Sequence, residues 1–440
     1  MSKKVIIKGT LILTIAGVAT KLLGFYNRIF LTRLIGVKEL GTYQLIFPIF
    51  MLAVSLSCQG IATTLTKHIA KNKNDHVLRK NYYILAVMLS LILALFSGII
   101  IYLLSDKISI IILKNSNCSL LLKAISITLP FISIKSCINA YFIGIDLPGY
   151  QGFSHFFEQI IRITSAYIFA YTLLSHSHNA LLAVIAVITG EIFASIFSII
   201  AFIKHIVKHK EFNKKTKHCN INKKICFSFL NDAIPITSTN LILMLFSGFE
   251  AIIMPAMLFK YYNNSDSAME MYGIITGIVI PFLLFPSTIT TSLSTMILPA
   301  VSHAKAINNR SKLTSALKNT IIFCSVLGFG ALIFYKLFGE FFCILFFHSN
   351  TAGEILKNMC ILCPFIYLSG TMSAILNGVD KSLNNLLINI ISISIRIFFT
   401  ITLVPKLGII SYIMGMGISY IFQDILMLIT LFNTVKKKKD

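Results

Sequence analysis

Residues 82–104 read YYILAVMLSLILALFSGIIIYLL, a run of 23 residues without a charged side chain. A helix needs about 20 apolar residues to cross the hydrocarbon core of a bilayer, so this run is long enough to span a membrane. The whole chain has the same character: its 440 residues are 56% hydrophobic and 12% charged, with a mean hydropathy of +0.82. Such a composition excludes a soluble enzyme, a disordered chain and a secreted disulfide scaffold. It indicates an integral membrane protein.

The chain contains twelve apolar runs of this kind. They lie near residues 5–32, 42–66, 82–104, 120–143, 155–175, 180–203, 226–250, 272–301, 316–338, 355–378, 384–404 and 408–434. We therefore expect an all-α membrane protein of about twelve transmembrane helices, with the short apolar segment 341–347 at the membrane interface. The connections are too short for a soluble catalytic domain.

The positive charges predict which side each loop faces. If the N-terminus is inside, 25 Lys and Arg residues lie on the inner side, 9 lie outside and five lie at membrane depth. Cytoplasmic loops carry such an excess of basic residues. Both termini and the basic segment 204–224 are therefore expected in the cytoplasm of a bacterium, and the net charge of +23 does not require nucleic acid.

An internal repeat divides the chain into two halves. Residues 121–165 and 355–399 share twelve identities in 45 positions at an offset of 234, where chance would give about three. The repeat predicts two parallel six-helix lobes, residues 1–210 and 225–440, joined by a basic linker, 211–224. Two such lobes are typical of an alternating-access carrier.

Five cations are expected at membrane depth. They are Lys21, Arg28, Lys135, Arg162 and Arg396. Each costs roughly 2.5 to 3.5 kcal/mol at the centre of a helix in lipid, so the set requires a water-filled cavity or specific partners.

The first helix carries two of these cations on one face. Small, polar and cationic residues recur there every three or four positions, and they are Thr10, Thr14, Gly17, Lys21, Gly24 and Arg28. Eighteen residues make five turns, so all six share one stripe. We interpret Lys21 and Arg28 as lining a cavity, with snorkelling or pairing to acids as the alternative.

The other three cations differ in their local partners. Glu158 lies four residues before Arg162 on the same helix face, so structural pairing and ligand contact are both open for Arg162. Arg396 has no acid three or four residues away, which favours a cavity or a partner on another helix. Lys135 is close enough to the outer end to snorkel and is the weakest candidate.

The seventh helix carries two acids, Asp232 and Glu250, which are 18 residues apart and therefore on one face. Asp232 is a candidate for Na⁺ or H⁺ coupling, or alternatively a helix cap near Pro235. Glu250 is expected at the outer end of the helix. We expect no other cofactor and no metal site, and we interpret the nine cysteines as reduced packing residues.

Two further helices are expected to bend, because prolines interrupt them among Ser and Thr residues. These prolines are Pro48, Pro281, Pro286 and Pro299. The ten histidines form no H-E-x-x-H or Ser/His/Asp set, and no Walker motif is present, so the sequence does not predict an enzyme.

The segments 17–36 and 41–48, GVATKLLGFYNRIFLTRLIG and GTYQLIFP, resemble the opening of the stage V sporulation protein B family. Three further stretches agree: Glu158-Gln159 with Arg162, Tyr272-Gly273 through Pro286, and Thr291 through Ser302. This family is related to MurJ-type lipid II flippases and belongs to the multidrug/oligosaccharidyl-lipid/polysaccharide exporter superfamily.

The resemblance implies a carrier that moves undecaprenyl-pyrophosphate-linked sugars or peptidoglycan precursors to the outer leaflet, for cell-wall or spore-cortex synthesis. In MurJ-type relatives, cations on the first helix are required; one matches Lys21, and the other falls on Asn27, beside Arg28. The predicted substrate-binding residues are therefore Lys21, Asn27, Arg28, Gln59, Arg162 and Arg396. An anionic diphosphate suits such a cationic face.

Three alternatives remain open. A multidrug cation exporter of the same fold would have acidic and aromatic cavity walls. A membrane-embedded transferase would need a catalytic acid or histidine near the interface and a larger external loop. A non-transporting scaffold for envelope assembly would tolerate loss of the buried cations. The sequence does not indicate the sugar or the oligomeric state.

Overall fold

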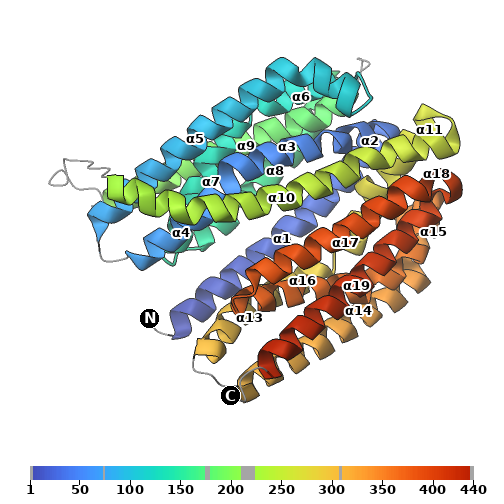
Figure 1. Ribbon diagram of the computed structural model, residues 1–440. Coiled ribbons are helices and arrows are strands. Elements are labelled where there is room, and N and C mark those ends of the chain that lie inside the picture. The colour runs from blue at the N-terminus through green and yellow to red at the C-terminus, as the bar shows by residue number, and fades with distance from the viewer. Residues whose placement is uncertain (1–2, 73–74, 174–178, 210–222, 307–309, 437–440) are drawn as a thin grey trace. The chain divides into compact units, whose positions relative to one another are not determined.

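The computed structural model describes residues 3–72, 75–173, 179–209, 223–306 and 310–436, and all regular structure within them is helical (Figure 1). The helices of the first half are α1 (Lys3–Ile35), α2 (Val37–Leu45), α3 (Phe47–Val54), α4 (Gly60–Lys71), α5 (His76–Lys107), α6 (Cys118–Ser126), α7 (Leu129–Gly144), α8 (Gly149–Leu173) and α9 (Asn179–His209). Those of the second half are α10 (Lys223–Tyr262), α11 (Ser265–Gly273), α12 (Ile280–Leu283), α13 (Ser287–Ala306), α14 (Arg310–Phe347), α15 (Asn350–Met359), α16 (Cys363–Gly378), α17 (Ser382–Thr402), α18 (Val404–Leu407) and α19 (Ile409–Lys436).

Within the described residues, nine helical segments are long and apolar enough to cross a membrane. A tenth is formed by α6 and α7 together, which meet at a bend of 45°. The two remaining predicted runs, 5–32 and 155–175, coincide with α1 and α8. These helices have 33 and 25 residues and carry charged side chains. The prediction of an all-α membrane fold is confirmed.

Two boundaries differ from those expected. The helix α14 continues through Phe347, so segment 341–347 is its last two turns rather than a separate interfacial piece. The helix α10 has 40 residues and ends at Tyr262, so Glu250 lies three turns inside it and not at its end. Each run was ended at or just before a glutamate, Glu250 or Glu340, but apolar residues follow that glutamate and the helix continues through them.

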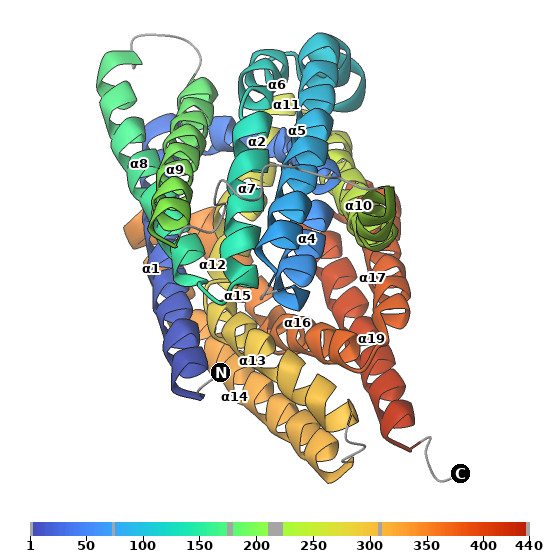
Figure 2. The same ribbon diagram turned by 90° about the vertical axis from the view of Figure 1, so that its left-hand side faces the viewer.

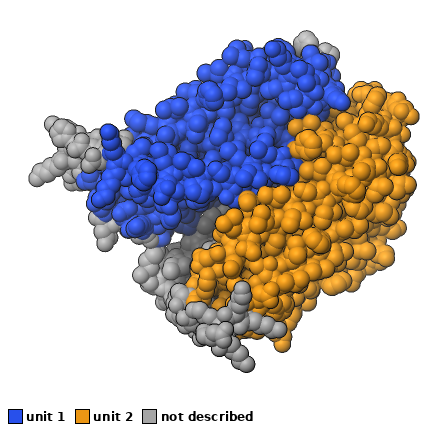
Figure 3. Space-filling model, viewed as in Figure 1, with its two compact units in different colours: residues 1–35, 42–248 blue, residues 36–41, 249–440 orange. Residues whose placement is uncertain are grey.

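The chain divides into two compact units (Figure 3). Unit 1 comprises residues 1–35 and 42–248, and unit 2 comprises residues 36–41 and 249–440. The division falls within α10, close to Gly248. Most of the proposed linker 211–224 lies outside the described residues.

The internal repeat is visible in the backbone. α7 and α16 begin and end at positions that differ by 234, and each has a proline in its first turn, Pro130 or Pro364. Each helix is followed by an aspartate with positive φ, 63° at Asp146 and 56° at Asp380. Proline suits the first turn of a helix, and aspartate tolerates the left-handed region. The repeated proline and aspartate therefore make α7 and α16 begin and end at equivalent positions.

The second and eighth spans, in which bends are predicted, are irregular helices. A π-helical segment, Ser55–Gln59, joins α3 to α4, and a second one, Ile274–Val279, joins α11 to α12. Residues 284–286 separate α12 from α13. Such π-helical turns shift the side chains that follow them relative to a regular helix.

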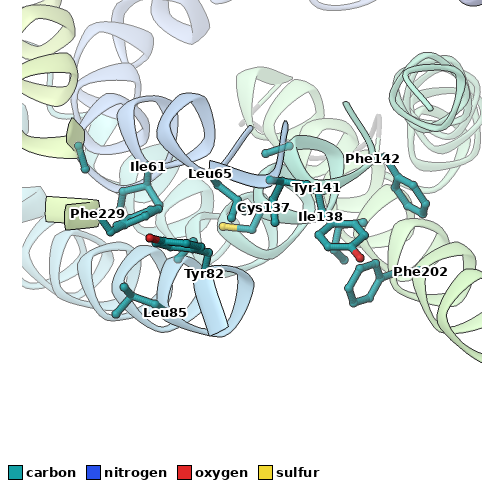
Figure 4. Close-up of a cluster of buried hydrophobic side chains, with 14 residues drawn as sticks. Ile61, Leu65, Tyr82, Leu85, Cys137, Ile138, Tyr141, Phe142, Phe202 and Phe229 are labelled. Carbon is teal, nitrogen blue, oxygen red and sulfur yellow. The ribbon is translucent and has the colours of Figure 1, made fainter. Parts of the chain in front are cut away.

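Aromatic packing holds one part of unit 1 together (Figure 4). Tyr141 and Phe142 of α7 meet Phe202 of α9 with edge-to-face geometry, at centroid distances of 5.3 and 6.1 Å. The helices α8 and α9 lie side by side in both ribbon views (Figure 2). This packing fixes α7, α8 and α9 relative to one another, and these three helices carry the charged site.

Candidate functional site

Unit 1 contains a cavity of about 430 Å³ that is lined by charged side chains. Lys135 comes from α7, Glu158 and Arg162 from α8, and Glu191 from α9. Gln59, at the end of the π-helical segment, also lines the cavity. The structure therefore brings together two predicted site residues, Arg162 and Gln59. Lys135, the weakest candidate in the sequence analysis, lines the same cavity.

The four charged residues form a closed ring of ion pairs, which we call the ionic cluster. Lys135 Nζ lies 2.7 Å from Glu158 Oε2 and also bonds Glu191 Oε2. Arg162 Nη2 lies 2.6 Å from Glu158 Oε1 and 2.9 Å from Glu191 Oε1. Both carboxylates are thus neutralised by both cations, which is how buried charges become tolerable.

A glycine permits this arrangement. A Cβ atom at Gly190 would lie 2.4 Å from Arg162 Cγ, so any larger residue there would displace the arginine side chain. Gly190 directly precedes Glu191 on α9. Because it has no side chain, the Arg162 guanidinium can pass over it and reach the Glu191 carboxylate. The Nε atom of Arg162 is buried and has no hydrogen-bond partner among the described residues.

The polar stripe of α1 lies on a single continuous helix, as predicted. The side chains of Thr10 and Thr14 lie outside the described residues. Lys21 is exposed, and a Cβ atom added at Gly17, one turn earlier, would meet nothing within 4 Å. Within the described part of the chain, no carboxylate forms an ion pair with Lys21. The stripe is therefore open around Gly17 and Lys21, whereas Gly24 faces Gln159.

The stripe and the ionic cluster are close to one another. α1 packs against α8, and the buried Tyr43 interacts electrostatically with both Arg28 and Arg162. The side-chain oxygens of Asn27 on α1 and Gln159 on α8 are buried without a hydrogen-bond donor among the described residues. The predicted residues Lys21, Asn27 and Arg28 thus lie on the helix that packs against α8.

Arg396, on α17 of unit 2, has a partner on another helix, one of the two alternatives that the sequence left open. Its Nη2 lies 3.0 Å from Glu250 Oε2, and its Nη1 donates to the Tyr420 hydroxyl at 3.2 Å. The guanidinium also lies over the Tyr420 ring, 5.4 Å from its centroid. Glu250 is 7% exposed, so it is a buried counter-ion and not an acid at a helix end.

The repeat places a neutral network in unit 2 where unit 1 has the ionic cluster. At the offset of 234, Ser392 matches Glu158, and its hydroxyl donates to Gln423 Oε1 at 2.9 Å. Gln423 donates in turn to Asn389 Oδ1 at 3.1 Å. The ionic cluster is therefore a feature of unit 1 and not of the fold in general.

Asp232 forms an ion pair within unit 1. Its Oδ1 accepts from Lys67 Nζ at 3.0 Å, and its Oδ2 lies 3.1 Å from His68 Nε2. The His68 ring stacks on Tyr82 at a centroid distance of 4.4 Å. Asp232 lies nine residues inside α10, so the alternative of a helix cap is wrong.

Ion coupling at Asp232 stays a prediction, and one substitution tests it. If the carboxylate belongs to an ion site, Asp232→Asn should remove the dependence of transport on Na⁺ or pH while the protein remains folded, because the amide keeps the shape and loses the charge. Transport by the variant would be measured across Na⁺ and pH gradients. An unchanged ion dependence would limit Asp232 to its pairing with Lys67.

The sequence analysis did not assign Glu191 to the site. The signal was present, because Glu191 is the only charged residue of the run 180–203. Intramembrane acids of this kind are functional candidates by default. Its partners, however, come from two other helices and follow only from their packing.

Comparison with known sequences identifies the family. A sequence model described as "Polysaccharide biosynthesis protein" matches residues 6–304, which is more than half of the chain. The chain belongs to this family of membrane transporters. It is 25% identical over 447 positions to stage V sporulation protein B of Bacillus subtilis (strain 168), covering 99% of this chain and 85% of the relative. It is 20% identical over 449 positions to the lipid II flippase MurJ of the same organism, covering 96% and 81%. The resemblance found in the sequence is confirmed.

Solved structures support the fold. A multidrug resistance MATE family transporter of the MOP superfamily, in an outward-facing conformation, superposes with a TM-score of 0.71 at 16% identity. The match covers 100% of this chain and 97% of that transporter. At this identity the similarity establishes the fold alone. It confirms the MATE-like fold that the resemblance to this exporter superfamily implied.

Proposed function

We propose that this transporter moves an undecaprenyl-pyrophosphate-linked sugar or peptidoglycan precursor from the inner to the outer leaflet of the cytoplasmic membrane by alternating access. Family membership supports a role in polysaccharide export, and the relatives named above include a sporulation protein and a lipid II flippase. The lipid carrier, the headgroup and any role in sporulation belong to the proposal.

The observation that carries the proposal is the unpaired cation on α1. Lys135, Arg162 and Arg396 each have a carboxylate partner, whereas no described carboxylate pairs with Lys21. An ammonium group at membrane depth requires water or an anion. A pyrophosphate supplies such an anion with several acceptor oxygens.

The neighbouring amides suit the sugar portion of such a substrate. The buried oxygens of Asn27 and Gln159 lack donors within the described residues, and sugar hydroxyls can donate to them. The position of a Cβ atom at Gly24 is 3.6 Å from Gln159 Oε1, so this oxygen borders the same stripe as Lys21. The stripe thus offers a cation for the phosphates and acceptors for hydroxyls.

A cation exporter of the same fold is less well supported. Its cavity would need net negative charge for a cationic drug. In unit 1, Glu158 and Glu191 are each bonded to both Lys135 and Arg162, so the cavity has no surplus negative charge.

A leaflet-resolved transport assay tests the proposal. Purified protein would be reconstituted into liposomes with a fluorescent undecaprenyl-pyrophosphate-linked sugar, and the fraction exposed in each leaflet would be followed with a membrane-impermeant quencher. The proposal expects protein-dependent exchange of this lipid and no efflux of ethidium. Ethidium efflux without lipid exchange would establish the drug exporter instead.

Orientation in the membrane is a separate prediction. The charge distribution places segment 204–224 in the cytoplasm, so a cysteine at Lys215, outside the described residues, should not react with an impermeant maleimide added to intact cells. Ser116→Cys, in the loop after the third span, is the external control because Ser116 is exposed and expected outside. Efficient labelling at position 215 would contradict the proposed topology.

A further inference from the structure

Unit 2 contains a buried carboxyl group that neither the charged site nor the repeat explains. Asp424 lies in the middle of α19 and is 4% exposed. Neither of its carboxylate oxygens has a hydrogen-bond partner among the described residues. A buried polar group without a partner costs free energy, and an ionised one costs far more, so a structure retains it only when another species satisfies it.

The surroundings of Asp424 are uncharged. α19 packs against α14, α16 and α17. From α14, the Cys324 thiol interacts electrostatically with Asp424, and it bonds the Thr371 hydroxyl of α16 at 3.3 Å. On α17, Arg396 is held by Glu250 and Tyr420. Within the described part of unit 2, no Lys, Arg or His forms an ion pair with Asp424.

The lack of a charged partner distinguishes Asp424 from the three buried glutamates described above. Glu158 and Glu191 share two cations, and Glu250 has Arg396. These cations offset the charge of each glutamate. Asp424 has none, so the group is stable there only when its charge is removed.

A proton removes that charge more readily than a metal ion at this place. Ca²⁺ and Mg²⁺ take six or more oxygen ligands when carboxylates bind them. Asp424 supplies only one side chain. The nearby Thr371 hydroxyl already donates to the Tyr367 carbonyl at 3.1 Å. Across the described residues, no group of three His, Cys, Asp or Glu side chains could hold a metal ion.

We propose that Asp424 is a proton-binding site of unit 2 and that it takes up and releases one proton in each transport cycle. The carboxylate accepts a proton from a hydronium ion, which leaves a neutral carboxylic acid and a water molecule, and release of the proton to water reverses the step. The protonated form fits the apolar packing of α14, α16 and α19. The deprotonated form favours a conformation in which water reaches the carboxylate, so proton occupancy shifts the conformational equilibrium.

Chemical labelling tests the site without any transport substrate, so its result is independent of the proposed lipid. Dicyclohexylcarbodiimide reacts with protonated carboxyl groups in apolar surroundings, and the adduct is located by mass spectrometry of the purified full chain. We expect an adduct at Asp424 that falls by about tenfold for each pH unit above the midpoint of titration, as the protonated fraction does. Na⁺ at constant pH should not protect the site.

Two variants provide the controls. Asp424→Asn should lose this adduct, whereas Asp380→Asn should retain it, because the Asp380 side chain is 85% exposed and lies outside the site. If Asp424→Asn does not fold, the pH and Na⁺ dependence of labelling in the unmodified chain still decides the question. Protection by Na⁺ would show a metal-ion site, and absence of an adduct at low pH would show no proton on Asp424. Either result would overturn the proposal.

A transport measurement tests the link to the cycle. In the liposome assay, an imposed pH gradient should change the rate of transport by the unmodified protein and by Asp380→Asn, and should have no effect on Asp424→Asn. The same assay separates this site from the one predicted at Asp232. A pH response that persists in Asp424→Asn and disappears in Asp232→Asn would assign coupling to Asp232 and overturn the role of Asp424.

Discussion

Replacing both Lys21 and Arg28 by alanine is expected to abolish transport of the lipid-linked sugar. A charge-assisted hydrogen bond contributes roughly 1.5 to 3 kcal/mol, so either single substitution should weaken substrate binding by about 10- to 150-fold. The double variant should lose at least about 100-fold, because both substitutions remove positive charge from one face of α1. Binding and leaflet exchange would be measured in liposomes with the same fluorescent lipid.

Two controls separate charge from folding. Lys21→Arg should largely retain activity, because the phosphate requires a cation and not a particular side chain. Lys357→Ala should have little effect, since Lys357 is half exposed and lies 3.8 Å from its partner Glu340. Full activity in a folded Lys21→Ala/Arg28→Ala protein would remove the anionic-headgroup hypothesis and favour the drug exporter or the scaffold.

The fold follows from the sequence largely because a bilayer restricts the alternatives. Long apolar runs must be helices, since each backbone polar group needs a partner inside the span. The offset of 234 predicts the second half from the first, and the matching starts of α7 and α16 confirm it. The helix ends were harder to predict, because α10 and α14 each continue past a glutamate, Glu250 or Glu340, into further apolar residues.

The site could be predicted only where its contacts are local. Arg162 and Glu158 are four residues apart on one helix, and their ion pair was one of the two alternatives that the sequence left open. Lys135 and Glu191 are joined by the packing of α7 against α9, which no spacing within one helix reveals. Asp424 is the only charged residue of its apolar run, 408–434, as Glu191 is of the run 180–203, so both could have been recognised as candidates from the sequence alone.

The ionic cluster predicts a large effect on stability. Lys135→Ala should lower the free energy of unfolding by about 3 to 5 kcal/mol, because it leaves Glu158 and Glu191 with one shared cation, Arg162, in a buried site. The chain has no tryptophan, so unfolding by urea in detergent micelles would be followed by far-ultraviolet circular dichroism. Lys123→Ala is the matched control in the same unit. Its partner Asp106 is 64% exposed, and an exposed pair contributes at most about 1 kcal/mol.

A second substitution distinguishes lost charge balance from lost packing. Lys135→Ala/Glu191→Gln removes one charge of each sign and leaves the pair of Arg162 with Glu158 intact, so the double variant should be more stable than Lys135→Ala alone. Recovery of stability together with loss of transport would mean that the charges themselves serve the transport cycle. No recovery would mean that the packing of Lys135 among α7, α8 and α9, and not its charge, is what this part of unit 1 requires.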